Sequence, residues 1–321
     1  MPPSVERVGT VHVDQLLSNL ARLYAPAMDG FIADIVCPYI DVVNESDLYP
    51  VFQQGDFYGT DVDDLVPDRA EPRIVDISHA TESYRTQRRE LAWDISDRER
   101  KNADSQLNLE RNKQRNVLAR LALKREARVA ALLRKTTNGG KLNLGADAAA
   151  PWDVATTTSI ETDVWTGREL MRKTIGVRPN TIVIPEAVAA GMQRNTQLTD
   201  KLKYTFGSSG SRPLLEEYYP VLPAILFGMR VEIPGLIQNT AKEGATPTYT
   251  DIWGESVRLL YVTDGPAIDN PSVAYTFRSE GLTTRTDRND RTRVDWFATG
   301  QTIDERVVAP DAGYEINNCL A

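Results

Sequence analysis

Cysteine and histidine are scarce in this chain of 321 residues, which has two of each. Cys37 and Cys319 stand far apart and outside any CxxC pattern, so we expect two free, partly buried thiols and no zinc site. His12 and His79 lack neighbours that would support general acid–base catalysis. We interpret both as solvated or contact residues.

Long apolar runs are also absent. No stretch approaches the roughly 18–20 apolar residues needed to cross a bilayer, and the first residues carry no secretory signal pattern. We therefore expect no membrane partner and a protein that stays in a cytoplasm. Apolar residues make up 41% and charged residues 26% of the chain, which argues against wholesale disorder.

Motifs that carry chemistry are missing as well. There is no GxSxG elbow and no HExxH, and the glycines of 138–142 lack the spacing of a phosphate-binding loop. Residues 61–64 resemble the start of a calcium loop, but the glycine and the distal glutamate of that motif are absent. We expect no catalytic residues, no cofactor and no bound metal.

Charge is segregated along the chain. Lys and Arg are absent between Leu23 and Asp68, where ten aspartates and glutamates fall, whereas 97–135 holds twelve basic residues against five acidic ones. The net charge is −8, so the rest of the chain totals −15. Both segments could be solvated faces, or the acidic segment of one subunit could dock on the basic segment of another. Specific nucleic-acid recognition is disfavoured, because 97–135 has no aromatics for base stacking and the chain is acidic.

The first half of the chain predicts extended elements around one long helix. Residues 13–23 have leucines at helical spacing, and the rest of 1–68 suggests an extended arm that must lie on another surface. Residues 73–95 predict a long polar β-hairpin that needs a neighbour, since an isolated two-stranded ribbon is marginal in water. Ser96 and Glu99 form a capping box for a helix that should run to Lys135, roughly 55–60 Å.

The second half predicts a mixed α/β arrangement. A helix is expected over 160–175, followed by a short buried strand over 181–184 and a helix that begins at Pro185. Exposed loops are expected at 207–211 and 239–248. The remaining strand candidates are 229–233, 256–263, 272–278, 293–298, 303–308 and 314–318.

This succession of elements resembles the major capsid protein of tailed bacteriophages, which has the Hong Kong ninety-seven type fold of the α+β class. The strings NTIVIPEAVAAGM, ILFGMRVEIPG, DIWGESVRLLYV and VDWFATGQTIDERVVAPDAGYEINNC add to the likeness. It covers essentially the whole chain but depends on element order and loose patterns. By resemblance, 1–55 would be the N-terminal arm, 56–96 the E-loop, 97–175 the peripheral domain with its spine helix, 176–289 the axial domain, and 290–321 a return to the peripheral domain.

The resemblance implies a structural protein that assembles with itself as pentamers and hexamers into an icosahedral phage head, the virion shell, around double-stranded DNA. A portal protein, a separate scaffolding protein, a decoration protein and non-specific contact with the packaged DNA are the further partners implied. The founding member links its subunits through an E-loop lysine, but the first lysine here is Lys101, so non-covalent contacts are expected.

Inter-subunit contacts are expected from the hairpin and from the acidic segment. Trp93 is the candidate anchor, although packing against its own spine helix is an equal alternative. The predicted contact residues are Arg85, Arg88, Arg89, Trp93, Asp61, Asp63 and Asp64. Two other functions stay open: an encapsulin-like cargo compartment of the same fold, and an α/β enzyme of unknown activity.

Overall fold

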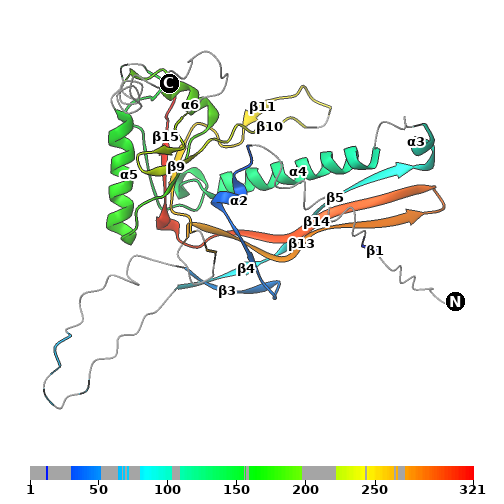
Figure 1. Cartoon of the computed structure of the whole chain (residues 1–321), viewed down its shortest axis with the longest axis horizontal. Coiled ribbons are helices and arrows are strands. Elements are labelled where there is room, and N and C mark those ends of the chain that lie inside the picture. Colours follow the sequence, from blue (N-terminus) through cyan, green and yellow to red (C-terminus); the bar gives the residue numbers. More distant parts are fainter. Residues whose placement is uncertain are drawn as a thin grey trace, which may run out of the picture.

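The computed structural model contains two main sheets, a long helix that lies along one of them, and two short two-stranded ribbons (Figure 1). All structural statements below concern the described residues. These are 12–13, 30–51, 64–66, 68, 71, 80–102, 109–154, 156, 159–196, 222–242, 244–263, 265–266 and 272–321.

The first sheet is built around a long hairpin, β13 (Ala274–Asn289) and β14 (Val294–Val307), whose strands are antiparallel. Strand β5 (Gln87–Ser96) extends the sheet beyond β14. On the other side, β13 pairs with the two-residue β1 (His12–Val13) and with β2 (Tyr39–Asp41), which runs parallel to it.

Strand β14 corrects the prediction of two separate strands over 293–298 and 303–308. The strand continues through Gly300, where a Cβ atom would come within 2.4 Å of the Arg89 carbonyl oxygen. Glycine there permits the close approach of β5 and does not mark the end of a strand.

The second sheet has six short strands and is covered by two helices. Helix α5 (Ser159–Ile175) and helix α6 (Glu186–Met192) supply apolar residues to its buried core. The predictions of a helix over 160–175 and a buried strand over 181–184 are confirmed; Pro185 lies at the N-cap of α6, one position before the helix proper. In spatial order the strands are β6 (Leu144–Asp147), β15 (Gly313–Asn317), β12 (Val257–Leu260), β7 (Thr181–Val183), β9 (Met229–Glu232) and β8 (Ile225–Leu226).

The predicted spine helix is found as α3 (Asp97–Asn102) and α4 (Leu109–Leu132), and 103–108 lie outside the described residues. The capping box is confirmed: the Glu99 backbone N–H donates to Ser96 Oγ at 3.1 Å, and the Ser96 N–H donates to Glu99 Oε2 at 3.2 Å. The helix ends at Leu132, three residues earlier than expected. A 3₁₀ turn, η2 (Thr136–Asn138), follows and closes at Gly139, whose φ is +80°.

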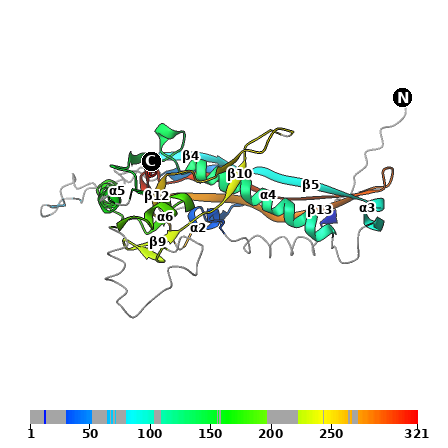
Figure 2. The ribbon, with the colours of Figure 1, turned by 90° about the horizontal axis from the view of Figure 1, so that it is seen from above.

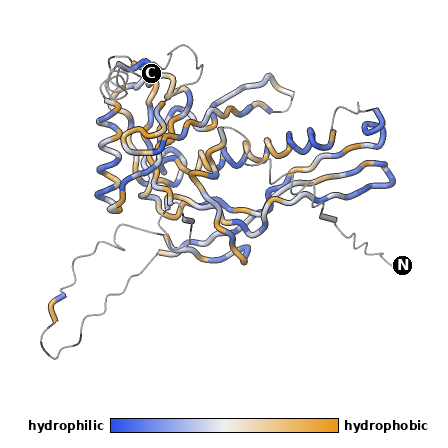
Figure 3. The backbone as a smooth tube through the Cα atoms, in the orientation of Figure 1, coloured by the Kyte–Doolittle hydropathy of each residue, from blue (hydrophilic) through white to orange (hydrophobic). Residues whose placement is uncertain are grey.

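Helix α4 lies along the long sheet (Figures 1 and 2). Val117 packs with Trp93, Ile95 and Phe297 in a small apolar cluster between helix and sheet. A larger core forms where the two sheets meet, and Figure 3 shows hydrophilic residues concentrated at the far end of the long hairpin.

Residues 30–51 correct the expectation that the N-terminal segment must borrow a surface from another copy. Helix α2 (Ala33–Val36), β2 and β3 (Ser46–Val51) pack on the body of their own chain, and the main core includes Ile32, Val36 and Tyr49. Contacts with residues about 90 to 240 positions away supply this surface. The helix expected over 13–23 lies almost wholly outside the described residues.

The hairpin expected over 73–95 is described only in part. Its first arm, marked by Val75 and Ile77, lies outside the described residues. Its second arm is found in β5, which pairs with β14, and the stretch expected between the arms contains β4 (Ala80–Arg85), which pairs with β3. A second ribbon, β10 (Ile237–Asn239) with β11 (Tyr249–Asp251), encloses the predicted loop 239–248; the loop expected at 207–211 lies outside the description.

Candidate subunit interface

A buried carboxylate fastens the N-terminal segment to the spine helix. Glu126, on α4, is fully buried and accepts hydrogen bonds from the Ala33 N–H at 2.9 Å, the Ile32 N–H at 3.3 Å and Trp253 Nε1 at 2.7 Å. Burial raises the pKa of Glu126, and these donors together with Arg125 oppose that rise. The first turn of α2 is thereby held against α4.

The neighbouring Arg125 holds the next part of the segment. Its guanidinium pairs with Asp34, donates to the Cys37 carbonyl oxygen at 3.1 Å and to Thr276 Oγ1 at 3.2 Å, and lies 4.2 Å from the Tyr39 ring centroid. Part of the acidic segment therefore meets the basic segment within one chain, and the expectation of pairing between copies can apply only to the rest.

Aromatic stacking fixes the β3–β4 ribbon to the long sheet. Phe277 is fully buried; its ring stacks on Tyr84 with centroids 4.5 Å apart and contacts Tyr49 at 5.3 Å. One face of the ribbon is thus covered by its own chain. The opposite face carries Ser46, Leu48 and Arg85, which are exposed.

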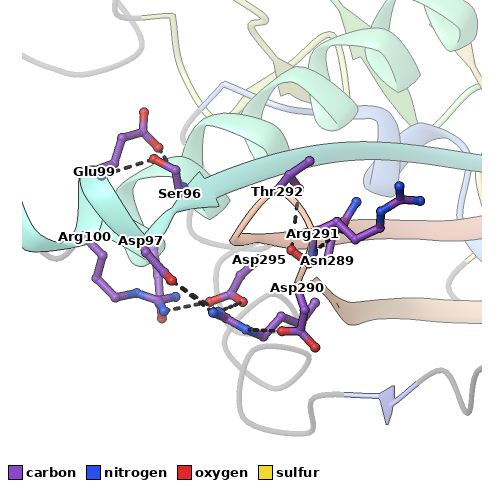
Figure 4. A network of polar contacts seen from close by, with 11 residues as sticks. Ser96, Asp97, Glu99, Arg100, Asn289, Asp290, Arg291, Thr292 and Asp295 are labelled. Atoms are coloured by element: carbon purple, nitrogen blue, oxygen red, sulfur yellow. Dashed lines mark hydrogen bonds and ion pairs between the residues drawn. The ribbon is translucent and has the colours of Figure 1, made fainter.

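An ion-pair network holds the far end of the long hairpin against α3 (Figure 4). Arg288 contacts Asp97 at 3.0 Å, Asp295 at 2.7 Å and Asp290 at 3.0 Å, and Arg100 contacts Asp295 at 2.7 Å. The hydrogen bond from Arg288 lowers the pKa of Asp97. Burial alone would raise the pKa of Asp295, but hydrogen bonds from the two arginines outweigh it and lower that pKa.

The structure separates the predicted contact residues. Arg85 is exposed, Arg88 pairs with Glu90 at 2.7 Å, and Nε of Arg89 is buried without a hydrogen-bond partner in the described structure. Asp64 is exposed and lies apart from these arginines in the sequence, while Asp61 and Asp63 lie outside the described residues.

Trp93 packs inside its own chain, which favours one of its two predicted roles. Only 8% of the residue is exposed, and its ring stacks on Phe297 with centroids 5.3 Å apart, next to Val117 of α4. This packing favours the second predicted role, in which Trp93 lies against its own spine helix, and a contact with another subunit stays a prediction. Trp93 stabilises the packing of the spine helix on the sheet.

Several large apolar residues are instead exposed on separate surfaces, and the sequence reasoning missed them. Trp165 of α5 is 61% exposed, Ile225 of β8 is 69% exposed, and Val43 before β3 is 99% exposed. Helical periodicity could have found Trp165, because Ile160, Val164 and Met171 mark the buried face of α5 and Trp165 lies off it.

The described residues contain no cluster of three or more histidine, cysteine, aspartate or glutamate side chains placed to hold a metal ion. Both cysteines are free and buried, and burial raises the pKa of each thiol to about 12. Among the helices of the described part, none is long and apolar enough to span a membrane.

Comparison with known proteins relates the whole chain to phage shells. No family model matches. The major capsid protein of Burkholderia phage BcepMu is 25% identical over 313 residues, which cover 95% of this chain and 96% of the relative.

Two solved structures share the fold. A phage-related protein from Bordetella bronchiseptica RB50 has a TM-score of 0.70 at 19% identity, covering 96% of this chain and 98% of that one. The capsid of cyanophage P-SCSP1u has a TM-score of 0.56 at 15% identity, covering 87% and 84%. These likenesses confirm the predicted fold class. The chain is thus similar, along nearly its full length, to a major capsid protein of a phage, and it shares its fold with a phage capsid protein of known structure.

Proposed function

We propose that copies of this chain assemble as pentamers and hexamers into an icosahedral head that encloses double-stranded DNA, and that the role is structural and not catalytic. The observation that carries the proposal is the match with the BcepMu major capsid protein, which covers 95% of this chain and 96% of that relative. Assembly in the host cytoplasm, with a portal protein, a separate scaffolding protein and a decoration protein as partners, belongs to the same proposal.

Exposed apolar side chains support association between copies. Val43, Trp165 and Ile225 lie on three separate elements, and each exposes more than half of its surface. A stable monomer gains nothing from such exposure, whereas a subunit with several neighbours can bury each residue in a different contact. A shell supplies several neighbours for every subunit.

The polar contacts of the shell would come from the end of β4, the start of β5 and the acidic segment. We propose that Arg85, Arg88 and Arg89 contact neighbouring subunits, together with Asp61, Asp63 and Asp64. Exposed ion pairs contribute only about 0–1 kcal/mol each, but a shell repeats them in every subunit. Changing the three aspartates to asparagine should therefore lower particle yield at low salt; unchanged yield would argue against their part in assembly.

The absence of lysine before Lys101 predicts a shell held by non-covalent contacts. Particles boiled in detergent should release single chains on a denaturing gel. A ladder of linked subunits would contradict this.

Electron microscopy of the purified protein and of virions tests the whole proposal. Closed shells that contain DNA are the expected result. Shells filled with a protein cargo would favour the encapsulin-like alternative, and a compact monomer at all concentrations would reject assembly.

A further inference from the structure

We infer that an acidic corner of one copy docks on a basic face of helix α4 in another copy. The acidic corner is 42–48, which is the turn after β2 together with the first residues of β3. The basic face is the exposed side of α4 that carries Arg120 and Lys124. This inference rests on the proposed function, because it names two surfaces through which the copies would meet.

The acidic corner combines negative charge with exposed apolar surface. Glu45 and Asp47 are exposed, Val43 is 99% exposed and Leu48 is 63% exposed. Contact of the apolar side chains with water is unfavourable, and the carboxylates repel the phosphates of nucleic acid. A basic protein surface that also presents apolar groups can contact both kinds of side chain favourably.

Hydrogen bonds hold this corner in one shape. The Glu45 carbonyl oxygen accepts from the Thr86 N–H at 2.8 Å and from Thr86 Oγ1 at 3.1 Å, and the Asn44 side-chain amide donates to Asp47 Oδ2 at 3.3 Å. Asp47 Oδ1 also accepts from the Leu48 N–H at 2.8 Å. A pre-organised surface loses little conformational entropy on docking.

The basic face of α4 has the complementary character. Arg120 and Lys124 are exposed one helical turn apart, and of the two carboxylates on α4, Glu126 is buried and Glu110 pairs with Arg100. Three half-buried apolar residues, Ala119, Leu123 and Ala127, lie close to these cations in the sequence of the helix. An apolar corner with two carboxylates can approach such a surface.

No printed hydrogen bond or ion pair joins the two surfaces within one chain in the described structure. In the view of Figure 1, α4 and the β3 end of the ribbon lie on opposite sides of the β13–β14 hairpin. Contact between two different patches of identical molecules is head-to-tail, and it closes into a ring or grows into an open array. Ring closure is what a pentamer or hexamer requires.

Charge exchange tests the contact. One variant combines Arg120→Glu with Lys124→Glu, and a second combines Val43→Lys with Glu45→Lys, which keeps the Asp47 carboxylate that holds the turn. Each should lower the yield of particles at low salt about tenfold, because each variant places charges of the same sign on both surfaces. The two variants combined should restore most of the yield.

A control matched to the α4 variant carries the same change in net charge elsewhere. Lys141→Glu with Arg178→Glu alters two exposed cations away from α4 and should leave the yield within about twofold of the unmodified chain. Thermal unfolding of every variant monitors folding, and a further variant, Val43→Ser, tests the apolar part of the corner without charge reversal. It should lower the yield at low and high salt alike, since apolar contact is not screened.

Three results would overturn the inference. Full particle yield from the α4 variant together with loss of packaged DNA would assign the basic face to nucleic acid. Failure of the combined variant to recover any yield would show that the two surfaces do not face each other. If the unmodified chain assembles and both charge variants assemble equally well, only the inference falls; if the unmodified chain never assembles, the proposed function falls first.

Discussion

The two ends of the β13–β14 hairpin are held by different forces. At the end near the second sheet, Ala274, Tyr275 and Phe277 are completely buried among apolar side chains. At the far end, Arg288 and Asp290 are exposed in an ion-pair network. The same two strands therefore pass from an apolar core to a solvated, charged tip.

Register shifts mark the change between the two ends. The pairing of β13 with β14 is irregular between Arg278 and Glu280 and again between Glu280 and Thr283. Such bulges bend a strand and let each part face a different neighbour. Apolar burial is large and indifferent to salt, whereas exposed ion pairs are weak and screened. The core end should thus determine most of the free energy of unfolding, whereas the stability of the tip should depend on salt concentration and pH.

The largest expected effect is at the core end. Phe277→Ala should lower the free energy of unfolding by about 4 kcal/mol, because it removes a buried ring and leaves a cavity beside Tyr49 and Tyr84. Denaturant titration of the unassembled subunit measures this change.

The matched change at the tip is Trp296→Ala. Trp296 is 43% exposed, so its loss should lower the free energy of unfolding by less than about 1 kcal/mol. Equal losses from the two substitutions would break the comparison between the ends.

A second effect concerns the buried carboxylate. Glu126→Ala should lower the free energy of unfolding by about 3 kcal/mol, because the N–H groups of Ile32 and Ala33 and the Trp253 indole lose their acceptor. Hydrogen exchange of the α2 amides should rise more than exchange elsewhere.

Glu126→Gln keeps one acceptor oxygen, so the free energy of unfolding should fall by less than in Glu126→Ala. Glu110→Gln, on the exposed part of the same helix, should lower the free energy of unfolding least. A Glu126→Ala protein as stable as the Glu110→Gln protein would mean that Glu126 does not fasten α2.

The smallest effect is a difference in acid response. The lowered pKa of Asp97 means that the tip network contributes fully above the unfolded aspartate pKa of about 3.9 and is lost as pH falls through the lower folded value. The raised pKa of Glu126 has the opposite sign, since the folded state favours the protonated form and its stability penalty is relieved below the folded pKa.

Hydrogen exchange at decreasing pH separates these responses. As the pH falls, amides near the β13–β14 tip should lose protection before those of α2. Arg288→Gln should cause the same loss of protection at the tip at neutral pH. Simultaneous loss of protection at both ends would contradict the assigned roles.

Local signals predicted much of the fold. The capping box at Ser96, the apolar phase of α5 and the buried strand before Pro185 all depend on neighbours within a few residues, and the structure contains all three. Predictions of this kind succeed because the stabilising contacts are close in sequence.

Long-range pairing could not be predicted in the same way. The partner of β4 is β3 and the partner of β5 is β14, and nothing in 73–95 distinguishes these choices from a simple hairpin. The sequence predicted two strands, 293–298 and 303–308, where β14 is continuous, because the contact of Gly300 with the Arg89 backbone is remote in sequence. The burial of 30–51 depends on Glu126, about 90 positions away.

The candidate interface was predicted least well. Charge segregation suggested contacts between subunits, but Arg125 forms an ion pair with Asp34 of its own chain. Trp93 was a candidate anchor by residue type alone, whereas Trp165 and Val43 are exposed because of how neighbouring elements pack. The exposed fraction of a side chain depends on the whole fold, and the residues next to it in the sequence predict that fraction only weakly.

Strands β4 and β5 form one continuous line of backbone, interrupted only at Thr86, that passes from the ribbon into the long sheet (Figure 1). A pull on the ribbon would therefore act along β5, parallel to the strand and perpendicular to its hydrogen bonds with β14. Bonds loaded in this direction share the force and must break together, whereas a strand peeled from its end loses them one at a time. The subunit is thus built to resist tension applied through its ribbon.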